Sequence, residues 1–112
     1  MANTFKLKTD TAVGTTLTTV YTVPASTTTV VIGAVLSNIT AGQVKANVQI
    51  VTASSTGENA DDVFLVRELP IPSGSSFELM EGKVVMETGD MFKVESDTAS
   101  SIDVALSIME QT

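Results

Sequence analysis

Apolar and polar residues alternate along much of this chain, and a period of two is the pattern of β-strands with one buried face. The clearest run covers residues 44–50, where four apolar residues alternate with Lys, Asn and Gln. The same alternation covers residues 102–109, near the end of the chain. Shorter runs predict further strands at residues 17–23, 63–69, 75–80, 83–87 and 91–95.

The segment 29–36 differs from the other runs, because it is apolar at almost every position. Such a run predicts a central strand covered on both faces, and its β-branched residues and Gly33 disfavour a buried helix. Turn residues separate the predicted strands. Among them, Thr88-Gly89-Asp90 predicts a hairpin between the strands at 83–87 and 91–95.

The expected fold is all-β, an antiparallel β-sandwich of about eight strands with jelly-roll or immunoglobulin-like topology. The 17 threonines and 11 serines favour strands and turns. A ligand-holding barrel is disfavoured, since short strands rich in Val, Thr and Ala give a thin, filled core. No linker or repeat divides the sequence, so residues 1–112 are expected to form a single domain.

The first ten residues allow two interpretations. Phe5 and Leu7 alternate with Lys6 and Lys8 as they would in a strand, but a polar, glycine-containing stretch at 9–16 separates them from the core strands. Residues 1–10 are therefore either an attachment arm that adds to the sheet of a neighbouring molecule, or an ordinary first strand of the same sandwich.

The composition of the chain excludes most kinds of catalytic and metal-binding site. The chain has neither His nor Cys, so the usual nucleophile–base pairs and the commonest transition-metal ligands are missing. We therefore expect a protein that is not an enzyme, with no catalytic residue, no cofactor and no metal site. The net charge of −7 argues against nucleic acid and anionic membrane surfaces as partners. No secretory signal begins the sequence, so synthesis is expected in the cytosol.

Two short motifs were weighed as candidate sites and set aside. The acidic residues Glu58, Asp61 and Asp62 lack the alternating spacing of a calcium-binding loop, and we expect them to be solvated. Asn38-Ile39-Thr40 matches the N-glycosylation pattern, but without a secretory signal it is expected to carry no sugar.

Some apolar residues fall outside the predicted core faces, and these are the candidate interface. The alternation that buries Ile108 puts Met109 and Ala105 on the opposite face of the last strand. Val51 lies outside the core stripe of residues 44–50. With the two apolar residues of the N-terminal segment, the candidate interface residues are Phe5, Leu7, Val51, Ala105 and Met109. They predict a homo-oligomer, for instance a trimer, or attachment to a repeated partner.

Three segments of the chain resemble a known class of protein. They are Tyr-Thr-Val-Pro-Ala-Ser-Thr-Thr-Thr-Val-Val at 21–31, Leu-Pro-Ile-Pro-Ser-Gly-Ser-Ser at 69–76, and Ser-Ile-Asp-Val-Ala-Leu-Ser-Ile-Met-Glu at 101–110. In these turn and strand patterns the sequence resembles small β-sandwich virion structural proteins of tailed bacteriophages, including cyanophages. The resemblance extends over most of the chain from Tyr21 onward.

The resemblance implies a non-enzymatic virion structural protein that is assembled into particles in the host cytoplasm. A capsid decoration (cement) protein, stabilising the phage head by packing against the major capsid protein, is the first expectation. A tail, neck or fibre-adaptor protein is the alternative, with tail or neck proteins as partners. A host-surface binding module is an alternative of another class, disfavoured because the chain has one Tyr, four Phe and no Trp.

Overall fold

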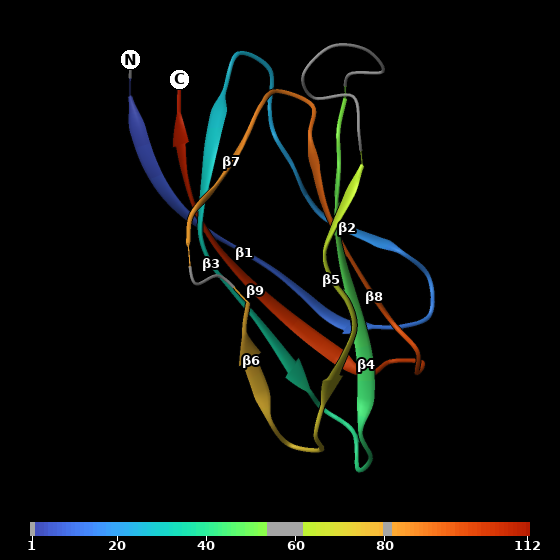
Figure 1. Ribbon diagram of the computed structural model, residues 1–112. Coiled ribbons are helices and arrows are strands. Elements are labelled where there is room, and N and C mark those ends of the chain that lie inside the picture. Colours follow the sequence, from blue (N-terminus) through green and yellow to red (C-terminus); the bar gives the residue numbers. More distant parts are fainter. Residues whose placement is uncertain (1, 54–61, 80–81) are drawn as a thin grey trace.

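The alternating sequence forms nine strands and no helix in the residues that the computed structural model describes, 2–53, 62–79 and 82–112 (Figure 1). Those residues accordingly contain no helix that is long and apolar enough to cross a membrane. The strands are β1 (Asn3–Val13), β2 (Thr18–Thr22), β3 (Thr28–Asn38), β4 (Val44–Val51), β5 (Val63–Ile71), β6 (Ser76–Glu78), β7 (Val84–Met86), β8 (Met91–Ser96) and β9 (Ile102–Gln111).

The strands form two antiparallel sheets. Sheet A has the order β1-β9-β3-β6, and β7 also pairs with β3; sheet B has the order β2-β8-β4-β5. The pairing is nested, because β1 pairs with β9, β2 with β8, β3 with β6 and β7, and β4 with β5. A long antiparallel ribbon rolled in this way is the jelly-roll topology. The predicted all-β sandwich is therefore confirmed, and of the two expected topologies the chain adopts the jelly roll.

The core lies between the inner faces of the two sheets. The two long alternating runs form most of two strands, residues 44–50 in β4 and residues 102–109 in β9. In both strands the buried face is the apolar one that the alternation predicted. The largest fully buried side chains are Phe92, Leu36, Ile71, Met86 and Ile102. With one aromatic ring among these five, the interior is filled mainly by aliphatic side chains.

Strand β3 is central in sheet A, as predicted, but the prediction that both its faces are covered is wrong. Val30 and Val35 are half-buried, and the Ile32 side chain is 39% exposed. Nothing in the described residues packs over the outer face of sheet A. Ile32 follows the inward Val31 and so projects from that outer face, and the bulge between Val31 and Gly33 keeps Ala34 on the buried side. The apolar run of β3 therefore forms core on one side and surface on the other.

The turn at Thr88-Gly89-Asp90 exists, but the predicted hairpin is wrong. The Asp90 N–H donates to the Glu87 carbonyl at 3.0 Å, and Gly89 has a φ of 87°, which favours glycine. The strands on either side belong to different sheets, because β7 pairs with β3 and β8 pairs with β2 and β4. The turn therefore carries the chain across the sandwich.

The N-terminal segment is the edge strand of sheet A. β1 pairs with β9 from Asn3 opposite Gln111 to Val13 opposite Ile102. The stretch interpreted as a polar separator begins inside this strand and contains a bulge, with Ala12 at a φ of 54°. Of the two interpretations of residues 1–10, this pairing matches the ordinary first strand of the same sandwich: the ladder to β9 takes one side of the β1 backbone and leaves its other side at the edge of the sheet.

A buried asparagine fixes the corner after β3. Asn38 is 3% exposed, and its Nδ2 donates to the carbonyls of Gly42 and Ile71, each at 2.8 Å. Its Oδ1 accepts hydrogen bonds from the Thr40 N–H and hydroxyl. The side chain joins the end of β3 to the end of β5, and the amide of the glycosylation motif is both buried and fully hydrogen-bonded.

We predict that Asn38→Ala lowers the free energy of unfolding by about 1–3 kcal/mol, because it leaves the buried Ile71 carbonyl without its Asn38 donor and removes one of the two side-chain donors to the Gly42 carbonyl. Urea denaturation measures the change. Asn3→Ala, at the exposed start of β1, is the control and should change the free energy by less than about 0.5 kcal/mol. Equal effects of the two substitutions would show that the corner does not depend on Asn38.

Candidate functional site

The outer face of sheet A carries a row of apolar side chains. In an antiparallel sheet, residues directly opposite each other project from the same face. Phe5 on β1 lies opposite Met109 on β9, Met109 lies opposite Val30 on β3, and Val30 lies opposite Val85 on β7. One apolar row therefore crosses four neighbouring strands.

This row is part of a larger exposed patch. The Phe5 side chain is 74% exposed and Val85 is 63% exposed, while Val30 and Met109 are half-buried. Leu7, two residues after Phe5, is 63% exposed. The sheet A patch comprises Phe5, Leu7, Val30, Ile32, Val85 and Met109. Contiguous exposed apolar surface of this kind is typical of protein–protein contacts.

The structure brings four of the five predicted interface residues to one face. Phe5, Leu7, Ala105 and Met109 all lie on the outer face of sheet A, where Ala105 pairs with Thr9 on β1. Val51 lies opposite Met91 on sheet B, on the other side of the sandwich. The single interface implied by the sequence therefore becomes one apolar face, with Val51 apart from it.

Three members of the patch, Val30, Ile32 and Val85, were not predicted from the sequence. Residues 29–36 were interpreted as covered on both faces, so the outward Val30 and Ile32 were assigned to the core, and Val85, in the strand predicted at 83–87, was assigned to neither face. The unbroken apolar run was the available signal. It indicates that a second surface needs covering, and among the described residues the fold itself covers only one of the two.

The outer face of sheet B is mixed: it carries a polar ladder on β4 and β8, but Phe64 on β5, opposite Gln49, is 44% exposed, and Val51 lies opposite Met91. Asn47 on β4 pairs with Glu95 on β8, and its Nδ2 donates to the Glu95 carboxylate at 3.0 Å. Gln49 pairs with Lys93 in the next outward position. A ladder of hydrogen-bonding side chains is satisfied by water. The two faces of the sandwich therefore differ in what they can bind.

Beneath the sheet A patch, the inner side of β1 is held by a buried polar network. The Lys6 Nζ lies 2.7 Å from the Glu110 Oε1, and Glu110 is 5% exposed. The Tyr21 hydroxyl donates to the Glu110 Oε2 at 2.5 Å and lies 2.7 Å from the Thr29 hydroxyl. The Lys8 Nζ lies 6.0 Å from the centre of the Tyr21 ring. The network joins β1, β2, β3 and β9.

The network fixes the protonation of its members. Hydrogen bonds from Lys6 and then Tyr21 lower the pKa of Glu110, which therefore stays ionised. Burial, and then the hydrogen bond to Glu110, raises the pKa of Tyr21 to about 12. A carboxylate and a phenol held in these states exchange no proton near neutral pH. The arrangement suits the positioning of β1 better than acid–base chemistry.

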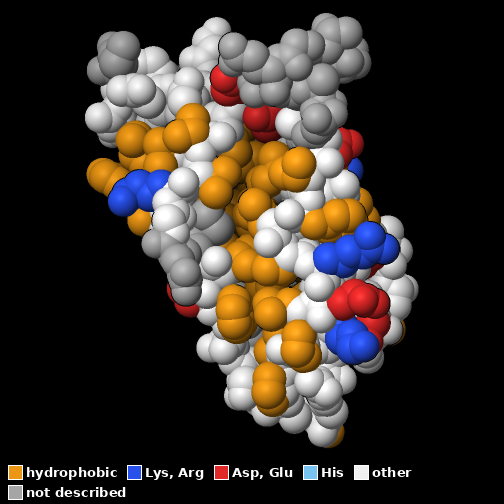
Figure 2. All heavy atoms as spheres, viewed as in Figure 1, with side chains coloured by type: hydrophobic (Ala, Val, Ile, Leu, Met, Phe, Trp, Pro, Cys, Tyr) orange, Lys and Arg blue, Asp and Glu red, His pale blue; other side chains and the backbone are white. Residues whose placement is uncertain are grey.

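A groove opens between the sheets on the side away from β1. It has a volume of about 380 Å³ and lies between β5, the edge strand of sheet B, and the edge of sheet A formed by β6 and β7. Figure 2 shows hydrophobic side chains in a band along this side of the molecule. The lining is Leu65, Val66, Phe77, Glu78, Leu79, Gly82, Lys83 and Val84.

The acidic cluster weighed as a metal site is only partly described. Glu58 and Asp61 lie outside the described residues. Asp62 accepts a hydrogen bond from the Thr52 N–H at 2.8 Å. Within residues 2–53, 62–79 and 82–112, no group of three or more acidic side chains is arranged to hold a metal ion.

Comparison with known proteins bears on the fold. No protein-family model matches the chain, and no curated protein matches it. A chain in a solved structure of Bacillus endospore appendages, a family of disulfide-linked pili, is similar with a TM-score of 0.52 and 16% sequence identity. The similarity covers 99% of this chain and 87% of that chain. At this identity the likeness shows a shared β-fold and no more.

We predict that Glu110 contributes stability that is lost in acid. Its pKa is lowered from 4.5 in the folded state, so the unfolded chain binds the proton first as the pH falls. The contribution is complete above pH 4.5 and disappears as the pH falls through the lower folded value. The substitution Glu110→Gln removes this contribution to stability. Urea denaturation at several pH values should show wild type losing more stability in acid than Glu110→Gln.

The pKa values of Asp97 and Asp103 are also lowered, so both proteins should lose some stability in acid. Only the difference between them reports on Glu110. Lys6→Met is a second variant that should reduce the acid-dependent part of the stability, because it removes the first cause of the Glu110 shift. Parallel curves for wild type and Glu110→Gln would contradict the role assigned to the network.

Proposed function

We propose that this chain is a non-enzymatic structural subunit that packs its sheet A patch against another protein in a repeated assembly. We further propose that the assembly is a virion and that the chain is a capsid decoration (cement) protein, stabilising a phage head. The observation that carries the proposal is the exposed apolar row from Phe5 to Val85 across four strands.

The energetics support a packing role. Burying a Phe or Leu side chain completely stabilises a contact by about 1.5–3 kcal/mol, and Phe5 and Leu7 are mostly exposed in the isolated subunit. One such contact is weak after the entropy of association is included. An oligomer that engages several identical sites of a particle at once multiplies it. A small subunit of this kind is effective on a repeated surface.

Charge and composition fit the same role. With a net charge of −7, free subunits repel one another before assembly, so association depends on a specific contact. The resemblance to phage virion proteins supports the head as the location, the major capsid protein as the partner, and assembly in the host cytoplasm. A homo-oligomer such as a trimer would present several copies of the patch to that shell.

A filament or ring subunit is the second candidate, and one observation favours it. The chain shares its β-fold with a chain of disulfide-linked pili, and the groove lies on the side of the sandwich away from β1. Because this chain has no cysteine, such an assembly would be held by non-covalent contacts. A tail, neck or fibre-adaptor protein would use the same geometry in a virion.

Immunogold labelling tests where in the particle the protein is located. We predict that antibody against the purified chain labels the shells of icosahedral heads released by the cells that produce it. Gold on tails or necks, or along filaments, would favour the second candidate instead. If all of the protein remains outside particles and filaments, the structural role itself is wrong.

We predict that the double variant Phe5→Thr/Leu7→Thr associates more weakly while its fold is unchanged. Threonine keeps the strand propensity of β1 but removes most of the apolar surface. The dissociation constant of the wild-type assembly, measured by sedimentation, should rise more than about tenfold, a change of 1.4 kcal/mol. The melting temperature should change little, since both side chains are exposed.

The matched control is Ile39→Thr. Its side chain is 50% exposed and lies in the corner after β3, outside the sheet A patch. Compared with the single variant Leu7→Thr, at a 63% exposed position, it removes a similar apolar surface from another place, so its dissociation constant should stay close to that of wild type while that of Leu7→Thr rises. If the control weakens association as much as the double variant, loss of exposed apolar surface in general explains the result and the patch has no special role.

A further inference from the structure

Four strand edges in the described residues have no neighbour in their own sheet: β1 and the β6–β7 edge in sheet A, and β2 and β5 in sheet B. Bulges, short strands and proline are features by which proteins keep such edges from pairing with other strands. β6 and β7 are three residues long each, and β2 has a register shift between Thr19 and Tyr21. β5 has two register shifts, a positive φ at Glu68, and Pro70.

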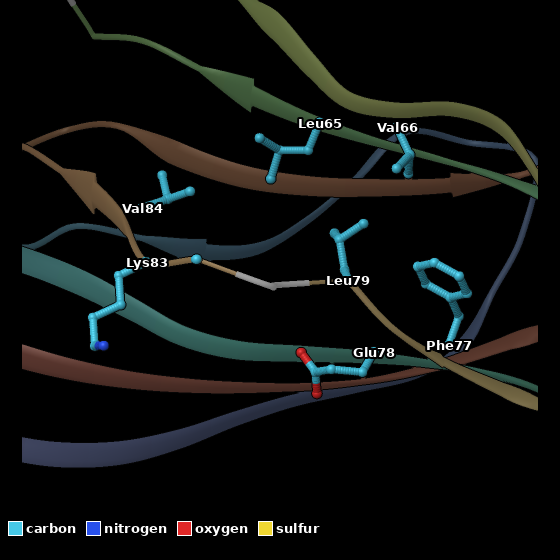
Figure 3. A pocket seen from close by; sticks show the side chains of 8 residues that line it. Leu65, Val66, Phe77, Glu78, Leu79, Lys83 and Val84 are labelled. Carbon is cyan, nitrogen blue, oxygen red and sulfur yellow. The ribbon is translucent and has the colours of Figure 1, made fainter.

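The β5 and β6–β7 edges lie on the two walls of the groove. In Figure 3 the side chains of Leu65 and Val66 on β5 and of Leu79, next to β6, point toward one another across the gap between these edges. Neither edge keeps an unbroken register over more than three residues. This side of the sandwich therefore presents side chains and short pieces of strand edge.

The edge of β1 is long and uninterrupted. The register of β1 with β9 is unbroken over the eight residues from Asn3 to Asp10, and it shifts only between Asp10 and Val13. Residues 3–7 are all exposed. Among the edges of the described residues, β1 is therefore the one that lacks the features that prevent pairing with another strand.

The hydrogen bonds to β9 determine which backbone groups of β1 are free. Ala2 and Thr112 exchange both of their backbone hydrogen bonds, at 3.0 and 2.9 Å. In an antiparallel pair, such positions alternate with positions whose N–H and C=O point away from the partner strand. Even-numbered residues of β1 therefore bond to β9, and the N–H and C=O groups of Asn3, Phe5 and Leu7 point to the free edge.

The two lysines of β1 limit how another strand can lie beside it. Both project from the inner face of sheet A, where the Lys6 Nζ lies 2.7 Å from the Glu110 Oε1 and the Lys8 Nζ lies 6.0 Å from the centre of the Tyr21 ring. Each lysine is thus turned back into its own subunit. Like charges directly opposite each other still destabilise a strand pair, so a partner strand should place no lysine opposite these two.

These two conditions select one register for β1 beside β1 of a second copy. Residues with free N–H and C=O groups must lie opposite one another, so the three pairings with the longest overlap are centred on Phe5, Lys6 or Leu7. Centring on Lys6 puts this lysine opposite itself, and centring on Leu7 puts it opposite Lys8. Centring on Phe5 puts both lysines opposite uncharged residues, Thr4 and Ala2. The edge is therefore complementary to itself, which identifies a second copy as the partner.

We propose that β1 pairs with β1 of a second copy in an antiparallel, two-fold dimer centred on Phe5. The two Phe5 rings lie opposite each other on the outer face, and Leu7 of each copy lies diagonal to the Phe5 ring of the other. These apolar contacts add to about six backbone hydrogen bonds. The contact is closed, because each copy has one such edge, so the homo-oligomer it forms is a dimer rather than a trimer.

The inference goes beyond the proposed function, because it uses the backbone edge of β1 rather than the outer face of sheet A. Antiparallel strands share the two faces of their sheet. The dimer therefore joins the outer faces of two A sheets into one continuous apolar surface that faces a single direction. Two copies of the sheet A patch would then meet another protein together.

Substitutions at one position separate backbone pairing from apolar contact. Leu7→Pro removes an N–H that points to the free edge, whereas Leu7→Thr removes the apolar side chain and keeps the N–H. Since this N–H is not used by β9, Leu7→Pro should stay folded, and Lys8→Pro, which breaks the ladder to β9, should lower the melting temperature much more. Asn3→Pro removes a second free N–H and should act like Leu7→Pro.

Sedimentation should show that wild type forms a dimer. The dissociation constant should rise at least about tenfold more in Leu7→Pro than in Leu7→Thr. If wild type stays monomeric at about 1 mM, the pairing is wrong. It is also wrong if the folded proline variants dimerise as well as Leu7→Thr.

Single cysteines test the register, because the chain has no cysteine of its own. In the pairing centred on Phe5, Phe5→Cys places two thiols opposite each other, with Cα atoms about 5.5 Å apart and within reach of a disulfide. The thiols of Leu7→Cys would be about 14 Å apart along the strands. Oxidation at a concentration where both variants are dimeric should link Phe5→Cys only. Equal linking of the two variants, or no linking of Phe5→Cys, would contradict this register.

The far end of the patch separates this inference from the proposed function. Val85→Thr changes a 63% exposed residue on β7, away from the β1 edge, and should leave the dimer unchanged. If the proline variants dimerise as well as Leu7→Thr while Val85→Thr weakens binding to particles, the inference alone fails. If the proline variants lose the dimer while particles bind Val85→Thr and Phe5→Thr/Leu7→Thr as well as wild type, the pairing stands and the proposed role of the patch is wrong.

Discussion

Glu110 is buried on the inner face of β9, where an ionised carboxylate needs a counter-charge and hydrogen bonds. Lys6 on the neighbouring strand supplies the charge, and Tyr21 from the opposite sheet supplies a hydrogen bond. Since side chains alternate along a strand, placing Lys6 inward forces Phe5 and Leu7 outward. One buried interaction therefore sets the orientation of the first strand and creates the most exposed part of the sheet A patch.

The same arrangement gives the sandwich two unlike faces. Sheet B presents a polar ladder on β4 and β8 with Phe64 on its edge strand, whereas sheet A presents an apolar row that extends to β7 at its far edge. The jelly roll brings β1 and β2 together on one side and leaves the groove open on the other. The apolar face and the apolar groove of the described residues are the features on which the proposed packing role rests.

The sequence predicted the elements well where period two was unambiguous, as in residues 44–50 and 102–109. It could not reveal pairing between distant strands, so the turn at Gly89 was interpreted as a hairpin although its flanking strands join different sheets. Alternation placed Met109 outside the core correctly. It could not show that Val30 and Val85 lie in the same row, because that depends on the register of β3 with β7 and β9.

Cysteine labelling measures directly whether the outer face of sheet A is buried in the assembly. The chain has no cysteine, so Ser107→Cys and Lys45→Cys each introduce a single thiol, one on the outer face of sheet A opposite Leu7 and one exposed on sheet B. Assembly should slow the reaction of a maleimide with residue 107 at least about tenfold and leave the rate at residue 45 nearly unchanged. Equal labelling of residue 107 in the assembled and dissociated protein would contradict burial of this face.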